Sequence, residues 1–264
     1  MDWWWAYLAI GAGVGLLAGL LGIGGGMVIV PMLVLVFTAK HFPAAHLMHL
    51  ALGTALATTV FTSLASVRAH HRHDGVDWRV VRAMAPGIAT GSLGAALVAG
   101  LIATRPLAAI FTVFLFYAAG RALVEAKPTA SRRLPGGVAL FAVGAGIGGV
   151  ASLLAAGGAF LSIPFLVWCN VPLRRAIGTA AANGFPIALA GSIGYVAQGL
   201  RATGLPEGTL GYIYLPALLF IVATSMLTAP LGARLTHRIP VKRLRMAYVL
   251  LLCALGVHML LTLW

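Results

Sequence analysis

The stretch from Gly11 to Leu33, GAGVGLLAGLLGIGGGMVIVPML, occurs a second time in altered form from Gly144 to Leu166, as GAGIGGVASLLAAGGAFLSIPFL. Eleven of the 23 aligned positions are identical, whereas chance would give about two or three in a chain rich in Ala, Leu and Gly. Gly53-Thr54-Ala55 follows the first copy, and Gly178-Thr179-Ala180 follows the second. The chain therefore contains an internal repeat.

The composition around this repeat is that of a membrane protein. Of the 264 residues, 61% are hydrophobic and only 9% are charged, whereas soluble domains are about half apolar and about one quarter charged. A soluble fold of this length could not hide so much apolar surface, and disordered chains lack such residues. We therefore predict an all-α polytopic membrane protein.

Ten apolar segments follow one another along the chain. They cover residues 4–21, 24–38, 47–67, 80–102, 106–124, 136–155, 158–169, 176–198, 212–235 and 244–263. Two of them, 24–38 and 158–169, are shorter than the about 20 residues that a spanning helix needs. Each is therefore expected to be a half-helix or a re-entrant segment.

The positive charges favour counting all ten segments. The chain has 18 Lys and Arg against 5 Asp and Glu, a net charge of +13, and basic residues concentrate in cytoplasmic loops. With ten segments and an outer N-terminus, the basic clusters at 68–82 and 234–245 both lie in the cytoplasm. An arrangement of eight segments puts one of these clusters outside.

Five segments in each half make an odd number, so the second copy must enter the membrane upside down. Inverted repeats of this kind build many secondary transporters, whose broken helices meet near the middle of the membrane. We therefore expect two inverted repeats of about five membrane segments each, with one short or broken segment per repeat. The N-terminal repeat covers residues 1–134 and the C-terminal repeat covers 135–264, with a polar link at 125–134.

Each short segment follows a glycine-rich run, and this run is the first candidate site. Glycines between membrane helices can serve close packing. Consecutive glycines that unwind the backbone before a helix also present N–H groups and the positive end of the helix dipole to an anion. We predict that the substrate lies at these breaks, which are formed by Gly24, Gly25, Gly26, Gly157, Gly158 and Ala159. A nucleotide-binding GxGxxG site is excluded, because no strand precedes the run.

Polar side chains beyond the breaks form a second group of candidates. They are Thr54, Thr58, Thr59, Thr179 and Asn183. If Thr54, Thr58, Thr179 and Asn183 face inward, they add hydrogen-bonding groups to the substrate site. The alternative for the hydroxyls is a bond to the i−4 carbonyl of their own helix.

His49 and Arg174 occupy matching places, four residues before Gly53 and Gly178. They are candidates for gating or anion attraction at opposite mouths of one pathway. The alternative, which we favour, is an interfacial side chain that reaches toward water.

The sequence predicts neither a catalytic centre nor a metal site. The carboxylates all fall at segment ends or in loops, at Asp2, Asp74, Asp77, Glu125 and Glu207. Pumps for cations use carboxylates inside the membrane, so this distribution speaks against cation transport. The cluster from His70 to Asp74 resembles a metal-binding tract, although we favour a solvated turn. Cys169 and Cys253 have no metal-site spacing. We expect no cofactor and no metal.

Two glycine-rich segments that contain Pro31 and Pro164, each followed by Gly-Thr-Ala, resemble the sulfite exporter TauE/SafE family, also called the toluene sulfonate uptake permeases. The resemblance covers nearly the whole chain. It implies a multi-pass carrier in the bacterial inner membrane for sulfite, sulfonates such as sulfoacetate, or related organic anions. The chain departs from the fuller glycine pattern at Ala155 and Ala159, which implies a tighter second half of the site.

We therefore predict an anion transporter and not an enzyme. Export is the favoured direction, because an anion leaving a negatively charged cytoplasm moves downhill without a coupling ion. Proton-coupled uptake of the same anions is the alternative. Besides the small anion, membrane lipid is the expected partner, nucleic acid is not, and the sequence leaves open whether protons take part or two copies form a homodimer.

Two other classes of protein fit the sequence less well. A membrane-embedded enzyme would have to combine His49 or His258 with one of four serines, Ser63, Ser66, Ser152 or Ser162, but the chain has no GxSxG motif. A non-catalytic scaffold would not need two matching glycine breaks.

Overall fold

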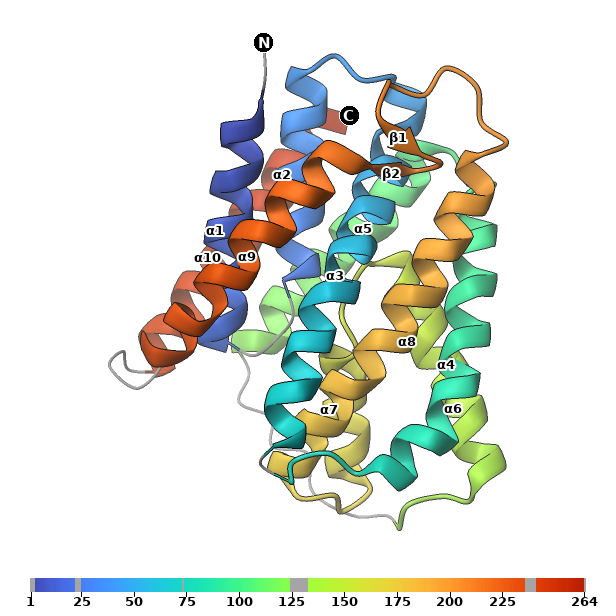
Figure 1. The fold of residues 1–264 in the computed structure, drawn as a ribbon, viewed down its shortest axis with the longest axis vertical. Coiled ribbons are helices and arrows are strands. Elements are labelled where there is room, and N and C mark those ends of the chain that lie inside the picture. The colour runs from blue at the N-terminus through green and yellow to red at the C-terminus, as the bar shows by residue number, and fades with distance from the viewer. Residues whose placement is uncertain (1–2, 22–24, 73, 124–132, 236–240, 264) are drawn as a thin grey trace.

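A computed structural model describes residues 3–21, 25–72, 74–123, 133–235 and 241–263, which form ten α-helices (Figure 1). The helices are α1 (Trp4–Leu21), α2 (Gly26–Ala39), α3 (Leu47–His71), α4 (Trp78–Ala99), α5 (Thr104–Leu123), α6 (Gly137–Leu153), α7 (Ala159–Trp168), α8 (Leu173–Gly199), α9 (Leu215–Leu235) and α10 (Val241–Leu263). A 3-10 turn covers Ala44–His46, and strands β1 (Thr209–Leu210) and β2 (Ile213–Tyr214) pair antiparallel.

These helices confirm the prediction of an all-α polytopic membrane protein. Each predicted apolar segment coincides with one helix to within four residues at either end. In the described part of the chain, five helices are long and apolar enough to cross a membrane, and five further apolar helices are shorter. The long ones cover Ala44–His71, Trp78–Ala99, Thr104–Leu123, Leu173–Gly199 and Leu215–Gly232.

The helices α2 and α7 are the short segments that the sequence predicts. They contain 14 and 10 residues, so they are about 21 and 15 Å long at 1.5 Å per residue, against about 30 Å of hydrocarbon in a bilayer. Each begins directly after a glycine, Gly25 or Gly158, and contains a proline in its second turn. Figure 1 shows that α2 returns toward the end where α1 begins, and α7 toward the end where α6 begins.

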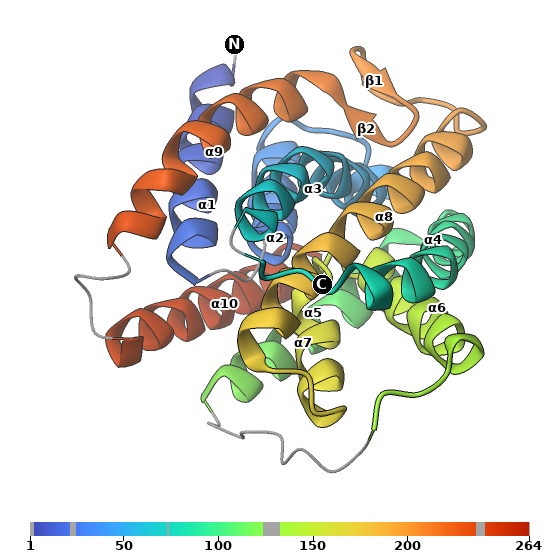
Figure 2. The same ribbon diagram turned by 60° about the horizontal axis from the view of Figure 1, so that its bottom comes forward.

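Small residues let the helices pack closely. The most extensive contacts join α4 to α6 and α1 to α9, and α3 packs on α8 in the interior (Figure 2). A Cβ atom on Gly144 of α6 would lie 2.6 Å from the carbonyl oxygen of Met84, and one on Gly15 of α1 would lie 2.5 Å from that of Ser225. Only glycine fits at such crossings, as is common between membrane helices.

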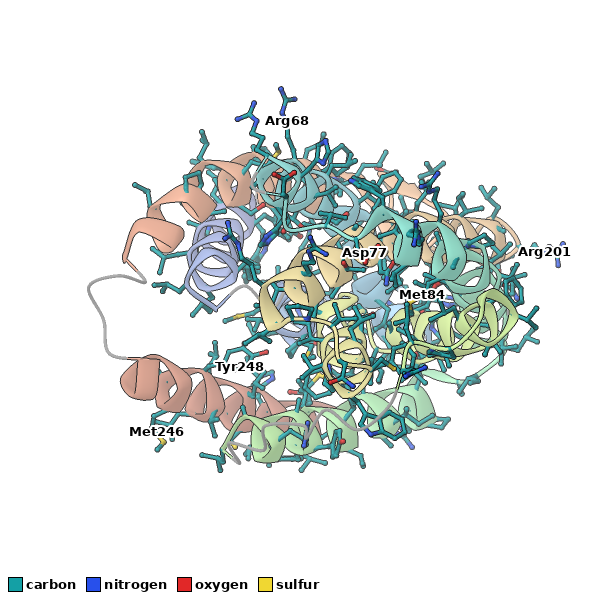
Figure 3. The ribbon with its side chains drawn as sticks, turned by 90° about the horizontal axis from the view of Figure 1, so that it is seen from below. Arg68, Asp77, Met84, Arg201, Met246 and Tyr248 are labelled. Carbon is teal, nitrogen blue, oxygen red and sulfur yellow. The ribbon has the colours of Figure 1, made fainter. Side chains whose placement is uncertain are left out.

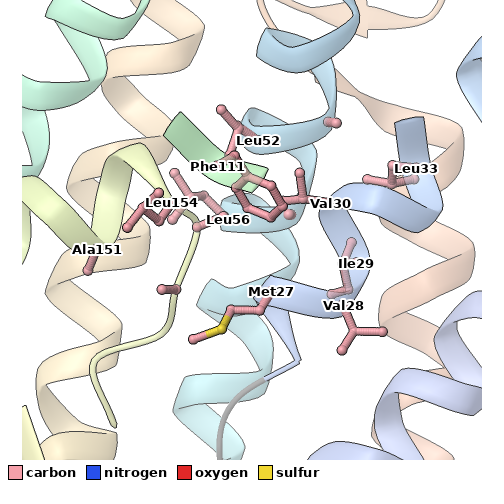
Figure 4. Packing of buried hydrophobic residues seen from close by; sticks show 14 of the residues in the cluster. Met27, Val28, Ile29, Val30, Leu33, Leu52, Leu56, Phe111, Ala151 and Leu154 are labelled. Atoms are coloured by element: carbon pink, nitrogen blue, oxygen red, sulfur yellow. The ribbon is translucent and has the colours of Figure 1, made fainter. Parts of the chain in front are cut away.

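Apolar packing fixes the short helix α2 against α3 and α5. Phe111 of α5 is fully buried and lies between Val30 of α2 and Leu56 of α3 (Figure 4). Leu33 and Leu52 extend the same buried cluster. Fully burying such side chains stabilises each by about 1.5–3 kcal/mol, and the packing thereby fixes the point at which α2 begins.

The connections lie at two opposite ends of the molecule. The β1–β2 hairpin and the connection from α2 to α3 lie at the upper end, together with the start of α1 and the end of α10, whereas the end of α3 and the start of α4 lie at the lower end (Figure 1). Viewed from below, Arg68 projects away from the helices, while Met84 and Tyr248 lie among them (Figure 3).

Candidate functional site

A cavity of about 460 Å³ lies among α1, α3, α8 and α9, where α2 and α7 begin. Of the predicted break residues, Gly25, Gly157, Gly158 and Ala159 all line this cavity. Gly24 lies outside the described residues. The two breaks, which are more than a hundred residues apart in the chain, therefore meet in one place.

The breaks pack so closely that they touch each other. Gly26 is buried, and a Cβ atom there would collide with the carbonyl oxygen of Ala155. Ala155 has a φ of 43°, a left-handed conformation that favours glycine. A Cβ atom on Gly158 would lie 2.8 Å from the carbonyl oxygen of Ala180 and 3.0 Å from the amide nitrogen of Gly184. Backbone therefore forms much of the wall at this point.

Hydroxyl groups form the polar part of the wall. Thr59, Thr62, Ser63 and Ser66 line the cavity from α3, and Ser225 lines it from α9. The hydroxyl of Thr59 donates to the carbonyl of Ala55 at 2.8 Å, which leaves the oxygen lone pairs to accept from other partners. Of these five, sequence reasoning named only Thr59 in its group of polar candidates, and it expected Thr54, Thr58, Thr179 and Asn183 to face the substrate instead. The spacing 59, 62, 63, 66 places all four on one helical face, and this signal would have revealed the polar stripe.

The two Gly-Thr motifs hold backbone instead of lining the cavity. The hydroxyl oxygen of Thr54 accepts a hydrogen bond from the backbone N–H of Tyr214 at 3.0 Å. The hydroxyl oxygen of Thr179 accepts one from the backbone N–H of Asp77 at 2.9 Å. Each threonine therefore fixes the start of a helix in the other half of the chain, α9 in the first case and α4 in the second.

Thr58 and Asn183 are also buried away from the cavity wall. The Thr58 hydroxyl donates to the carbonyl of Thr54 at 2.9 Å, the local bond that the sequence offered as an alternative. The Asn183 amide nitrogen donates to the sulfur of Met84 at 3.7 Å, and its Oδ1 has no partner among the described residues.

His49 and Arg174 do not line the cavity either. His49 is 3% exposed, and its Nε2–H donates to the carbonyl oxygens of Ala99 at 3.1 Å and Ile102 at 3.0 Å. Because carbonyls only accept, Nε2 carries the proton. His49 therefore caps the end of α4 instead of reaching water. Arg174 is exposed in the first turn of α8.

One end of the cavity is open and the other is closed. Exposed residues of α3 and α9, such as Ala65 and Met226, border the cavity toward the lower end, where His70 also lines it. At the upper end, the Tyr214 ring makes edge contacts with Phe37 and Phe42, and its hydroxyl accepts a hydrogen bond from Lys40 at 2.8 Å. The cavity therefore reaches the surface beside α3 and α9 in the lower half of the molecule, below these aromatic contacts.

Comparison with known proteins gives the family. The family model described as "Sulfite exporter TauE/SafE" matches residues 7–259, a range that contains both breaks and the whole cavity. The chain belongs to the TauE/SafE sulfite exporter family.

Relatives of this TauE/SafE protein occur in bacteria and archaea. A probable membrane transporter protein of Haemophilus influenzae is 36% identical over 262 residues, which are 96% of this chain and 97% of the relative. A probable membrane transporter protein of Methanocaldococcus jannaschii is 26% identical over 96% of this chain and 94% of its own length. No solved structure matches the chain. The protein is thus a multi-pass membrane transporter and not an enzyme.

Proposed function

We propose that this TauE/SafE transporter carries sulfur-containing anions, such as sulfite or sulfonates like sulfoacetate, across the bacterial inner membrane. The observation that carries the proposal is the meeting of both glycine breaks in one cavity. The name of the matching family supplies the substrate class. The volume of about 460 Å³ lies within the usual range for small-molecule sites.

The chemistry of the cavity suits an oxyanion. The first N–H groups of a helix have no partner within that helix, and with the helix dipole they favour an anion. The starts of α2 and α7 face this cavity at Gly25 and Ala159. Four of the lining hydroxyls donate to carbonyls of their own helices, those of Thr59, Thr62, Ser63 and Ser225, and in this proposal they rotate to donate to the anion. Among the described lining residues none is acidic. In this proposal the oxyanion accepts hydrogen bonds from both breaks.

An inverted repeat is part of the proposal, with halves at 1–134 and 135–264. Matching contacts across the two halves support it. Thr54 binds the start of α9 while Thr179 binds the start of α4, and α1 pairs with α9 as α6 pairs with α4. Such symmetry lets one binding site face either side of the membrane in turn. If the basic lower end is cytoplasmic, the cavity described here faces the cytoplasm.

Export is the direction that the electrostatics favour. Moving one elementary charge across 100 mV is worth about 2.3 kcal/mol, and a cell interior that is negative drives an anion outward. The alternative is proton-coupled uptake of the same anions. Its support is His70, a titratable side chain in the cavity wall, because histidine binds and releases protons near neutral pH.

Transport by the purified protein in liposomes tests the proposal. We expect flux of at least one anion from a panel of sulfite, sulfoacetate, thiosulfate and sulfate, with chloride and a monovalent cation as controls. Flux of the cation with none of the anions would overturn it. Imposing a membrane potential at equal pH, and then a pH gradient without a potential, separates export from proton-coupled uptake.

A further inference from the structure

The open cavity has a repeat-related counterpart that is closed. The relation between the two is the inverted repeat of the proposed function. Aligning the two glycine breaks pairs Ile29 with Ser162, and aligning the two Gly-Thr-Ala motifs pairs His70 with Tyr195. Ile29 and His70 line the open cavity. Inverted repeats put the equivalent residues of the other half on the path to the opposite side of the membrane. Ser162, one turn after the start of α7, then marks the inner end of the path to the upper side, and Tyr195, in the last two turns of α8, marks its upper part.

The surroundings of Tyr195 and His70 match closely. A Cβ atom on Gly53 would lie 3.2 Å from the Cβ of Tyr195, and one on Gly178 would lie 3.2 Å from the Cβ of His70. The backbone carbonyls of both residues accept a hydrogen bond from the connection that follows, at 3.3 Å for Tyr195 and 3.0 Å for His70. The pairing of these two residues therefore holds in space as well as in sequence.

The difference between the two halves is how far the helices are separated. On the lower side, Ala69 of α3 lines the open cavity. Its counterpart on the upper side is Gly194 of α8, which packs against α4. A Cβ atom on Gly194 would lie 2.6 Å from the Cβ of Ala96 and 3.2 Å from the carbonyl oxygen of Leu93. The upper half is closed by the contact between α4 and α8.

This closed half contains buried hydroxyl groups without partners. Ser152, Ser162 and Tyr195 are all 0% exposed, and within the described residues their side-chain oxygens have no hydrogen-bond partner. The Ser152 oxygen would lie 2.7 Å from a Cβ atom on Gly191 of α8. Leaving buried hydroxyls unpaired costs free energy, and such groups in a native structure call for a functional explanation.

We propose that Ser152, Ser162 and Tyr195 line the outer half of the substrate path, which opens when α4 separates from α8, with Tyr195 as the outer counterpart of His70. In the closed form these hydroxyls are unpaired. In the open form each O–H donates to water or to an oxyanion in transit. The unpaired groups disfavour the closed form and thereby keep the two forms closer in free energy.

Cysteine labelling tests this path. The background replaces Cys169 and Cys253 with alanine, and Ser162→Cys is the reporter for a membrane-impermeant thiol reagent added outside. Gly194→Val wedges α8 from α4, and Gly94→Val on α4 is the matched control, because a Cβ atom there meets nothing within 4 Å. We expect the wedge to raise outside labelling by about tenfold relative to the control, since overpacking disfavours the closed interface by an amount of this order.

A second reporter separates opening from loss of structure. Ser63→Cys lies in the lower cavity, and its labelling from the cytoplasmic side should fall in the wedge variant as outside labelling of Ser162→Cys rises. Labelling that rises at both positions, or changes at neither, would overturn the proposal. Reciprocal labelling in a protein that carries none of the sulfur anions would support the path while refuting the proposed substrate class.

Discussion

Valine in place of Gly158 is the substitution whose effect the structure predicts most directly. A Cβ atom at this position lies 2.8 Å from the carbonyl oxygen of Ala180, 3.0 Å from the amide nitrogen of Gly184 and 3.2 Å from the Cδ1 of Ile187. Two of these neighbours are backbone atoms of α8, so the helix itself would have to shift. Overpacking of this kind costs about 1–3 kcal/mol.

That cost falls on the geometry of the binding site. Because about 1.4 kcal/mol corresponds to a tenfold change in an equilibrium constant, we expect Gly158→Val to lower anion flux by about tenfold to a hundredfold. The assay is the initial rate of sulfoacetate or sulfite flux in liposomes, normalised to the amount of inserted protein. Size-exclusion chromatography of the purified variant checks that it is folded.

Gly146→Val is the control for this experiment. Gly146 lies on α6, the helix before the same break, is exposed, and has open space around the added Cβ atom. The control should transport at close to the normal rate. Equal flux by Gly158→Val and Gly146→Val would refute the claim that the second break forms the site.

Three further predictions follow from the topology, the electrostatics and the packing. Asp74→Cys and Glu207→Cys, both exposed, should react with impermeant reagents on opposite sides of the membrane, and reaction of both from outside would contradict the inverted repeat. An inside-negative potential should speed anion efflux at equal pH, whereas efflux that follows only a pH gradient would favour proton coupling. His49→Leu should lower the free energy of unfolding by about 1–3 kcal/mol, because two carbonyls at the end of α4 lose their donor. Thermal melting in detergent measures this loss. An unchanged melting temperature together with lost transport would indicate instead that His49 acts in the transport pathway.

The segments and breaks were predictable because their signals are local. A run of about 20 apolar residues predicts a membrane helix, and consecutive glycines before a proline-containing segment predict where a helix begins. The ten helices agree with this reasoning at both ends, and the short helices α2 and α7 were evident from length alone. The meeting of the breaks at Gly25 and Gly158 is what an inverted repeat predicts, since related segments of such repeats approach each other.

The partners of the polar residues were not predictable in the same way. Thr54 and Thr179 looked like groups that face a substrate, yet each accepts a hydrogen bond from a connection more than a hundred residues away in the chain. Which backbone N–H lies opposite a hydroxyl depends on how α3 and α8 pack against the other half of the chain. This packing cannot be read from the sequence alone. His49 was likewise expected to reach toward water, because nothing near it in the sequence indicates that it lies beside the end of α4.

Protection of a cavity cysteine by substrate is the measurement that tests the central claim most directly. Ser63→Cys, in a background without Cys169 and Cys253, places one thiol on the cavity wall formed by α3. With the cytoplasmic side exposed in inside-out vesicles, a sulfonate that the protein transports should slow labelling of this thiol, and the protection should be lost when Gly158→Val is added. Labelling that is unaffected by any transported anion would contradict a substrate site between the two glycine breaks.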